Sequence, residues 1–221
     1  MVNVSSKRAF SSSTNSRAFS RRDLLVIVAV AVLGAVVFWT LFEKVREKSR
    51  RIYCINNLQQ VGLGFRTWAL DHREKYPMVV STNSGGSSEY VVTGDVFRHF
   101  QVMSNELSTS RILVCPSDSR KSAKTFERNF GNSNLSYFVC IVSNASAPQM
   151  FLSGDRNIQG GTKLPNGLLE IGTNDVIQWK PGMHKVDGNI GLADGSVQGF
   201  SNDSLQNGLR YSGDTNRFAI P

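Results

Sequence analysis

The sequence predicts an α+β fold in which one long N-terminal helix packs on an antiparallel β-sheet. Two observations predict the helix: residues 24–42 form an uncharged apolar run, and apolar side chains recur every third or fourth position over residues 52–68. A third observation predicts the sheet, because short β-like segments separated by turn residues follow Pro77. The sequence shows no long repeat and no second helical domain, so we expect a single α+β domain behind the helix.

The apolar run LLVIVAVAVLGAVVFWTLF contains 19 residues and no charge. A helix needs about 20 apolar residues to cross the hydrocarbon core of a membrane. A signal peptide has an apolar core of only about 7–15 residues, followed by a small-residue cleavage site, whereas this run leads directly into EKVREKSRR. We therefore expect a basic cytoplasmic leader over residues 1–22, a transmembrane helix over residues 23–42 and an α+β domain over residues 43–221.

The net charge of +8 is concentrated around the apolar run. Residues 1–22 carry five Lys or Arg and no acid, residues 23–53 carry five basic and three acidic residues, and residues 54–221 carry fifteen and fourteen. The nearly neutral domain argues against nucleic-acid binding. The basic flanks suit anionic lipid headgroups, and the leader without acids is placed in the cytoplasm.

The helix is expected to extend from Asp23 to about Asp71, and Pro77 ends it. Its apolar stripe consists of Ile52, Ile55, Leu58, Val61, Phe65 and Trp68. Further along the chain we expect a short helix capped by Asp95, a brief β-like run over residues 112–118 and a buried strand within residues 135–144. Three more β-like pieces are expected at residues 175–179, 188–193 and 196–200.

Residues 18–26, AFSRRDLLV, resemble the type IV prepilin class of leader. In that class a basic leader ends in Gly, Phe follows, and an acid stands at the fifth mature position. Here Ala18 stands where Gly is usual, Phe19 fits, and Asp23 replaces the usual Glu. The resemblance implies leader processing before Phe19 and an Asp23 that meets the N-terminal amine of a neighbouring subunit. Asp23 also has a simpler interpretation, as a first-turn acid that suits the helix dipole.

Three further motifs are similar to those of pseudopilin-like proteins that carry the prepilin-associated H-x9-DG domain. The motifs are CxNNLxQxG with Cys54, Asn56 and Asn57, CPSD with Cys115, Pro116 and Asp118, and H-x9-DG with His184, Asp194 and Gly195. The resemblance implies a pilin-like fold and a structural, non-enzymatic subunit of a type II secretion or type IV pilus-like system. Such a subunit is a single-pass protein of the bacterial inner membrane with its C-terminal domain in the periplasm.

The resemblance implies no cofactor, no nucleic acid and no small-molecule substrate. The expected partners are membrane lipid and, through the N-terminal helix, further copies of the chain or other pseudopilins. Two other functions stay open. One is a permanently anchored periplasmic binding or adaptor protein; the other, less favoured, is a metal-binding sensor or enzyme centred on His184.

The three cysteines, Cys54, Cys115 and Cys140, allow one disulfide and one free thiol if the domain lies in an oxidising compartment. No two of them are close enough in the sequence to form a C-x-x-C motif. We therefore expect no zinc site.

The stretch HKVDGNIGLADG contains two Asp-Gly dipeptides, which are typical of type I′ hairpin turns. If both turns form, residues 183–200 make a three-stranded meander in which His184 pairs with Gly191 and Gly191 with Gln198. His184 then lies on the more polar face of the meander and ties down a loop.

A calcium site is the competing interpretation of the same stretch. The side chains of Asp187, Asn189 and Asp194 supply oxygen atoms, but the spacing lacks the EF-hand pattern. We therefore expect no metal here.

Overall fold

The computed structural model describes residues 20–221, so Ala18 and Phe19 lie outside the described residues. The chain divides into two compact units, one ending at Lys44 and the other comprising Val45–Pro221. Helix α1 (Arg21–Asp71) contributes to both units. The predicted long helix is confirmed, with its first residue two positions earlier than expected.

Asp23 takes part in the cap at the start of α1. Its carboxylate accepts a hydrogen bond from the backbone N–H of Ser20 at 3.0 Å, and the Ser20 hydroxyl accepts one from the N–H of Arg22 at 3.3 Å. These bonds satisfy two N–H groups at the helix start, in the manner of a capping box. They give Asp23 a local role in its first-turn position, and its role between subunits stays a prediction.

The apolar first part of α1 is a candidate single membrane span, because it is long and apolar enough to cross a bilayer. Its side chains are exposed within the chain; Phe38 and Trp39, for example, are 69% and 68% exposed. Such a surface requires a cover of lipid or of other apolar helices.

In the second unit, α1 contributes one face to a hydrophobic core. The buried residues of this face are Cys54, Leu58, Val61, Gly62, Gly64, Phe65, Trp68 and Ala69. The predicted stripe is therefore confirmed from Leu58 onward, but Ile52 is 50% exposed and Cys54 occupies the core instead. Small residues lie on this face because neighbours approach closely: a Cβ on Gly64 would lie 2.8 Å from Leu107.

The sheet that covers α1 has seven antiparallel strands in the order β4-β5-β9-β1-β2-β7-β8. The strands are β1 (Tyr137–Cys140), β2 (Phe151–Asp155), β4 (Thr162–Lys163), β5 (Leu168–Gly172), β7 (Gly188–Leu192), β8 (Val197–Phe200) and β9 (Thr215–Ala219). A separate antiparallel pair is formed by β3 (Ile158–Gly160) and β6 (Ile177–Trp179). The buried strand and the three further β-like pieces predicted from the sequence are thus confirmed as β1, β6, β7 and β8.

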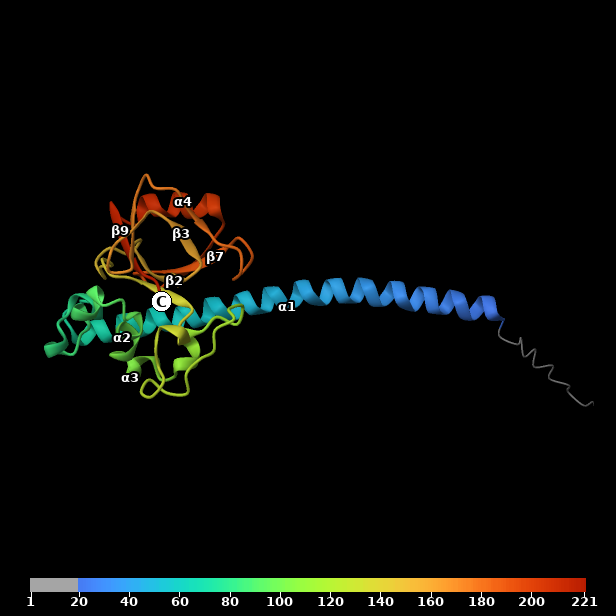
Figure 1. Cartoon of the computed structure of the whole chain (residues 1–221), viewed down its shortest axis with the longest axis horizontal. Coiled ribbons are helices and arrows are strands. Elements are labelled where there is room, and N and C mark those ends of the chain that lie inside the picture. The colour runs from blue at the N-terminus through green and yellow to red at the C-terminus, as the bar shows by residue number, and fades with distance from the viewer. Residues whose placement is uncertain (1–19) are drawn as a thin grey trace, which may run out of the picture. The chain divides into compact units, whose positions relative to one another are not determined.

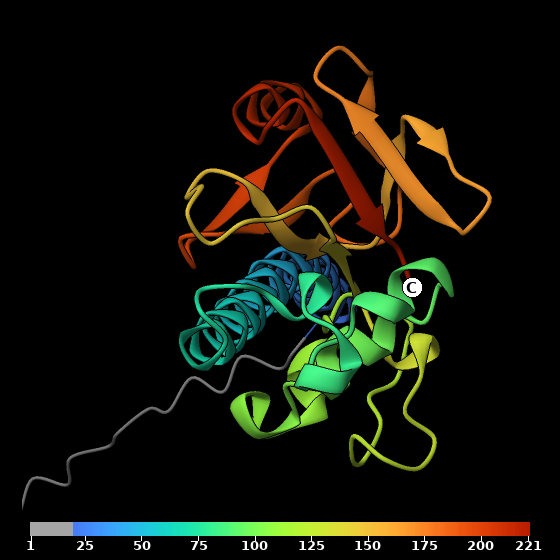
Figure 2. The ribbon, with the colours of Figure 1, turned by 90° about the vertical axis from the view of Figure 1, so that its left-hand side faces the viewer.

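The two faces of the sheet bury different cores. Along β1, Tyr137 and Val139 belong to the core that includes α1, whereas Phe138 and Cys140 belong to the core on the opposite face. That opposite face is covered by helix α4 (Asn202–Tyr211) and the β3–β6 pair, as Figures 1 and 2 show. Within the second unit, α1 lies between the sheet and a layer of short helices.

The layer of short helices contains two α-helices and five 3₁₀ helices. Their bounds are α2 (Val96–Gln101), α3 (Ser104–Leu107), η1 (Pro77–Val79), η2 (Thr82–Ser84), η3 (Ser88–Val92), η4 (Ser110–Leu113) and η5 (Asn132–Asn134). Asp95 precedes α2 as predicted, but its carboxylate accepts a hydrogen bond from Thr93 and does not cap the helix. The predicted β-like run at residues 112–118 is wrong, because η4 and a turn occupy these positions.

The predicted meander over residues 183–200 is only half correct. The β7–β8 hairpin forms, but Gly191 pairs with Val197 and Ile190 pairs with Gln198. A type I′ turn needs positive φ at both central residues, whereas here Gly195 has a φ of 88° and Asp194 is not among the described residues with positive φ. The pairing is therefore shifted by one residue, and His184 precedes the first strand without pairing with Gly191.

We predict that His99 in α2 makes the domain less stable in acid. It is 1% exposed, its Nδ1 lies 2.8 Å from the Ser87 hydroxyl, and burial lowers its pKa to about 4. Below the unfolded pKa of about 6.5, the unfolded chain binds a proton that the folded chain does not, so stability falls between pH 6.5 and pH 4 by about 2–3 kcal/mol. Urea unfolding of the full chain in detergent, at several pH values, measures this loss.

His99→Asn is the matched control, because it keeps a polar group near Ser87 and cannot be protonated. The variant should lose less stability than the wild type over the same pH interval. Equal losses in the two proteins would show that other groups produce the acid sensitivity.

Candidate metal centre

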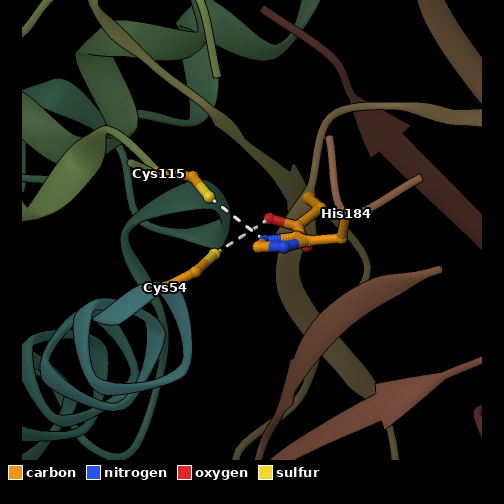
Figure 3. A group of neighbouring side chains, drawn as sticks. Cys54, Cys115 and His184 are labelled. Atoms are coloured by element: carbon orange, nitrogen blue, oxygen red, sulfur yellow. Dashed lines mark hydrogen bonds and ion pairs between the residues drawn. The ribbon is translucent and has the colours of Figure 1, made fainter. Parts of the chain in front are cut away.

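Four side chains from different parts of the second unit converge beneath the sheet. Cys54 lies on the buried face of α1, Cys115 follows η4, Asp155 is the last residue of β2, and His184 lies in the loop before β7. Figure 3 shows Cys54, Cys115 and His184 pointing toward one another from these separate segments. We call these four residues the Cys₂AspHis cluster.

The potential ligand atoms of the cluster all lie within 4.8 Å of one another. Cys115 Sγ is 3.2 Å from His184 Nε2, and Cys54 Sγ is 3.3 Å from Asp155 Oδ1. The second Asp155 oxygen, Oδ2, lies 3.8 Å from the same His184 Nε2. The two thiols, the carboxylate and one imidazole nitrogen therefore surround a common point.

The backbone around the cluster fixes the positions of its side chains. His184 has a φ of 47°, a left-handed conformation that non-glycine residues rarely adopt. Asp155 Oδ2 accepts hydrogen bonds from the backbone N–H of Asn189 at 2.7 Å and from its side-chain amide at 3.0 Å. The Tyr137 hydroxyl lies 3.4 Å from Cys54 Sγ. These contacts leave the cluster little freedom to rearrange.

The cluster is buried: Cys54, Cys115 and Asp155 are 0% exposed and His184 is 6% exposed. Burial raises the pKa of Asp155 to about 7 and raises that of Cys54 well above its usual value. The hydrogen bond with Cys54 lowers the pKa of Cys115 to about 5. Burial opposes the charged form of His184, but the hydrogen bond to Cys115 and the charge of Asp155 outweigh it and raise its pKa. Cys115 is thus the thiol that gives up its proton first.

The geometry does not match a Cys-His-Asp catalytic triad. In such a triad the nucleophile and the acid contact different nitrogens of the imidazole. Here Cys115 and Asp155 both approach Nε2, while the buried Nδ1 has no hydrogen-bond partner within residues 20–221. Cys115 also has no exposed surface through which a substrate could reach it. Convergence on one nitrogen instead matches the way ligands surround a metal ion.

The prediction that His184 lies on a polar face of a meander is wrong, because its ring is buried. The ring does contact a loop, since its Nε2 lies 3.2 Å from the sulfur of Cys115 in the segment that follows η4. The sequence predicts no zinc site, because 60 residues separate Cys54 from Cys115 and no two cysteines form a short ligand pair. Asp155 belongs to none of the motifs that the sequence contains. The only sequence signal for the site was that two of the cysteines and this histidine belong to recognisable motifs.

The three cysteines are free thiols in the structure. Cys140 lies on the opposite face of the sheet, where its thiol donates to Asn216 Oδ1 at 3.8 Å. Of the pairings left open by the sequence, only Cys54 with Cys115 therefore brings two sulfur atoms close together.

The other motif residues bring the same segments together. Asn57 donates a hydrogen bond to the backbone oxygen of Val114 at 3.1 Å, next to CPSD. A Cβ on Gly62 would lie 3.6 Å from Gly195, and the backbone oxygen of Asp194 accepts a hydrogen bond from Arg66. CxNNLxQxG on α1 is therefore the surface on which CPSD and H-x9-DG pack.

Three motif residues lie outside this contact surface. Asn56 and Pro116 are exposed, and Asp118 forms an ion pair with Arg156, at 2.8 Å from its Nε. Of these three residues, Asp118 joins the CPSD turn to the residue after β2, and none belongs to the cluster.

The side chains considered for a calcium site make separate contacts. Asp187 forms an ion pair with Arg51 at 3.0 Å, and Asp194 Oδ1 accepts a hydrogen bond from the N–H of Ser196 at 2.8 Å. The Asn189 amide nitrogen donates to Asp155, and its buried Oδ1 has no hydrogen-bond partner within residues 20–221. These contacts give the calcium interpretation no support.

No protein-family model matches the chain, and comparison with the curated proteins and with the solved structures finds no match in either set.

Proposed function

We propose that the chain is a non-enzymatic, pilin-like subunit anchored in a bacterial inner membrane by the first part of α1. Its leader lies in the cytoplasm and its folded domain in the periplasm. It assembles through the apolar part of α1 with further copies or with other pseudopilins of a type II secretion or type IV pilus-like system.

The observation that carries this proposal is the double role of α1. One uninterrupted helix, Arg21–Asp71, begins with an apolar stretch that is exposed in the chain and ends as part of a domain core. The same helix therefore contributes both to the candidate membrane span and to the core of the folded domain. This is the architecture required of a subunit that moves between a bilayer and a filament of like helices.

The contacts of the motif residues support a structural role. Residues of CxNNLxQxG, CPSD and H-x9-DG join α1 to the sheet and to the short helices. The side chains among them that could react, the thiols of Cys54 and Cys115 and the imidazole of His184, are buried. The similarity of these motifs to those of pseudopilin-like proteins, and the basic leader ahead of the span, support the family and the orientation.

The mature N-terminus and the assembly state test the proposal. The full chain is expressed in a bacterium that has a prepilin peptidase, and mass spectrometry of the purified membrane protein should find Phe19 as its first residue. A photo-crosslinker at Leu33, 67% exposed in the apolar stretch, should trap oligomers within the membrane. The same group at Leu70, 76% exposed on the domain side of α1, is the control and should trap fewer.

Asp23 adds a second readout. Asp23→Asn should reduce the oligomers trapped at Leu33, and Asp23→Glu should retain them, because only an acid pairs with the amine of a processed neighbour. An intact leader together with monomers at both crosslinker positions would contradict the proposal. That result would favour the permanently anchored adaptor.

A further inference from the structure

We propose that the Cys₂AspHis cluster binds one zinc ion in a closed, tetrahedral, structural site. The ligands are Cys54 Sγ, Cys115 Sγ, His184 Nε2 and one carboxylate oxygen of Asp155. The inference does not depend on pilus-like assembly, because it rests only on the geometry within the folded unit Val45–Pro221.

The distances between the ligand atoms fit a zinc tetrahedron. Zn–S bonds of about 2.3 Å and Zn–N or Zn–O bonds of about 2.0–2.2 Å place neighbouring ligand atoms about 3.3–3.8 Å apart. The cluster has 3.2 Å from Cys115 Sγ to His184 Nε2 and 3.3 Å from Cys54 Sγ to Asp155 Oδ1, while the other Asp155 oxygen, Oδ2, lies 3.8 Å from His184 Nε2. The two separations that involve sulfur therefore need to change by only a few tenths of an ångström, and the four ligand atoms already lie within 4.8 Å of one another.

The donor set selects the metal class. Two thiolates favour a borderline or soft ion over calcium or magnesium, which prefer oxygen ligands. One imidazole and one carboxylate complete four-coordination, the usual number for structural zinc. All four protein ligands are buried, so no open position is left for a substrate or a water nucleophile. The site is accordingly structural and not catalytic.

A Cys54–Cys115 disulfide is the main competing state of the same residues. It would use the two sulfur atoms but leave the Asp155 carboxylate and the His184 imidazole buried next to an uncharged bond. The disulfide would also remove the hydrogen bonds that the two thiols make with Asp155 Oδ1 and His184 Nε2, and the loss of such partners is costly for buried polar atoms. A zinc ion uses all four groups at once, and it also protects the two thiols from oxidation in a periplasmic domain.

The surroundings of Asp155 match the second layer of a metal site. Asn189 donates two hydrogen bonds to the Oδ2 atom of Asp155, which orients the carboxylate and leaves Oδ1 directed at Cys54. Residues that orient metal ligands in this way typically change the affinity by about 10–100-fold when they are replaced. Asn189 is therefore a positioning residue of the proposed site.

The first experiment measures metal in the full chain purified in detergent without metal-affinity tags or chelators. We expect one zinc per chain by elemental analysis. Exchange for cobalt(II) should give the intense visible absorption of a tetrahedral, thiolate-ligated ion. In the zinc form Cys54 and Cys115 should resist alkylation, and removal of the ion by a chelator should expose both.

Variants identify the ligands. Cys115→Ser and His184→Ala should lose the stoichiometric zinc, and Asp155→Asn, which keeps the shape of the side chain, should weaken zinc binding while the fold is retained. Asn189→Ala should lower zinc affinity by about 10–100-fold. Cys140→Ala is the matched control: Cys140 is as buried as Cys115 but lies on the other face of the sheet, so this variant should keep one zinc per chain.

Two results would overturn the proposal. One is a reduced, folded chain that binds neither zinc nor cobalt when these are supplied, or a purified chain that holds a Cys54–Cys115 disulfide and no metal. The other is zinc that stays bound with unchanged affinity in folded Asp155→Asn and Cys115→Ser. Neither result bears on the N-terminus or on crosslinking at Leu33, so failure of the zinc site and failure of the proposed function can be told apart.

Discussion

Replacing Phe65 by alanine should lower the free energy of unfolding of the domain by about 3–5 kcal/mol, the usual cost of removing a fully buried aromatic ring. Phe65 is 0% exposed on the inner face of α1. Its ring centroid lies 5.8 Å from that of Tyr76 and 5.9 Å from that of Phe100, in edge-on arrangements. Truncation removes both contacts at the point where α1 meets the short helices.

Leu63→Ala is the matched control for Phe65→Ala. Leu63 lies two positions earlier on the same helix but is 64% exposed, so its truncation should change the stability by less than about 0.5 kcal/mol. Thermal unfolding of the full chain in detergent compares the two; 3–5 kcal/mol corresponds to a fall in Tm of about 6–20 °C for a domain of this size. Equal unfolding temperatures would show that this part of α1 does not belong to the domain core.

Phe65 also illustrates what the sequence could predict. Its position in a stripe with a period of 3.6 residues indicated burial, because a helix presents every third or fourth residue to the same side. The segment that forms β1 alternates too little for a half-exposed strand, and its apolar character indicated a buried one. Helical periodicity and a short apolar run therefore identified these two elements of the core.

Periodicity could not predict the loop before β7. Asp187-Gly188 has the composition of a hairpin turn, yet Gly188 begins strand β7, where a Cβ would lie 2.6 Å from atoms of the Trp179 ring. Glycine is needed there for close approach and not for a turn. This need for glycine becomes visible only from the position of Trp179, nine residues earlier in the sequence. Helix α4 was missed for a related reason, since only Leu205 and Leu209 bury its apolar face.

The Cys₂AspHis cluster lay beyond sequence reasoning for a different reason. Cys54, Cys115 and His184 were recognised as motif members, but each motif was interpreted separately. What brings them together is the tertiary contact of α1 with the sheet, through pairs such as Gly62 with Gly195. Metal ligands that are separated by several tens of residues leave no short spacing pattern in one sequence. Their association therefore becomes visible only in the folded chain.

The ion pair between Arg156 and Asp118 links two segments that carry cluster residues, because Arg156 follows Asp155 and Asp118 belongs to the CPSD turn after Cys115. The guanidinium donates to both carboxylate oxygens, from Nε and from its terminal nitrogen, each at 2.8 Å. The side chain of Asp118 is 1% exposed and that of Arg156 is 28% exposed. Burial opposes the charge of Asp118, but the bonds from Arg156 and Ser136 hold its pKa at about 2.

The unequal exposure of the two partners predicts unequal effects of their removal. Arg156→Ala leaves a buried carboxylate without its counter-ion and should cost about 3–5 kcal/mol at pH 7. Asp118→Asn leaves an arginine that can turn toward solvent, so its cost should be smaller. The double variant should be more stable than the sum of the two single effects predicts, because it also removes the charge stranded by Arg156→Ala. Arg156→Lys, which keeps the charge but loses the two-pronged contact, should fall between the wild type and Arg156→Ala.

The pH dependence of the stability gap between the wild type and Arg156→Ala distinguishes the effect of the Asp118 charge from the effect of side-chain packing. The native pKa of Asp118, about 2, lies below the unfolded value of about 3.9, so the ion pair stabilises the fold above the unfolded value and its contribution is lost as the pH falls toward 2. The gap in stability between the wild type and Arg156→Ala should therefore narrow as the pH is lowered from 7 to 3. Denaturant unfolding of both full chains in detergent, with a chelator present to keep them free of metal, measures the gap at each pH. A gap that stays constant would mean that Arg156 acts through the packing of its aliphatic stem and not through the charge of Asp118.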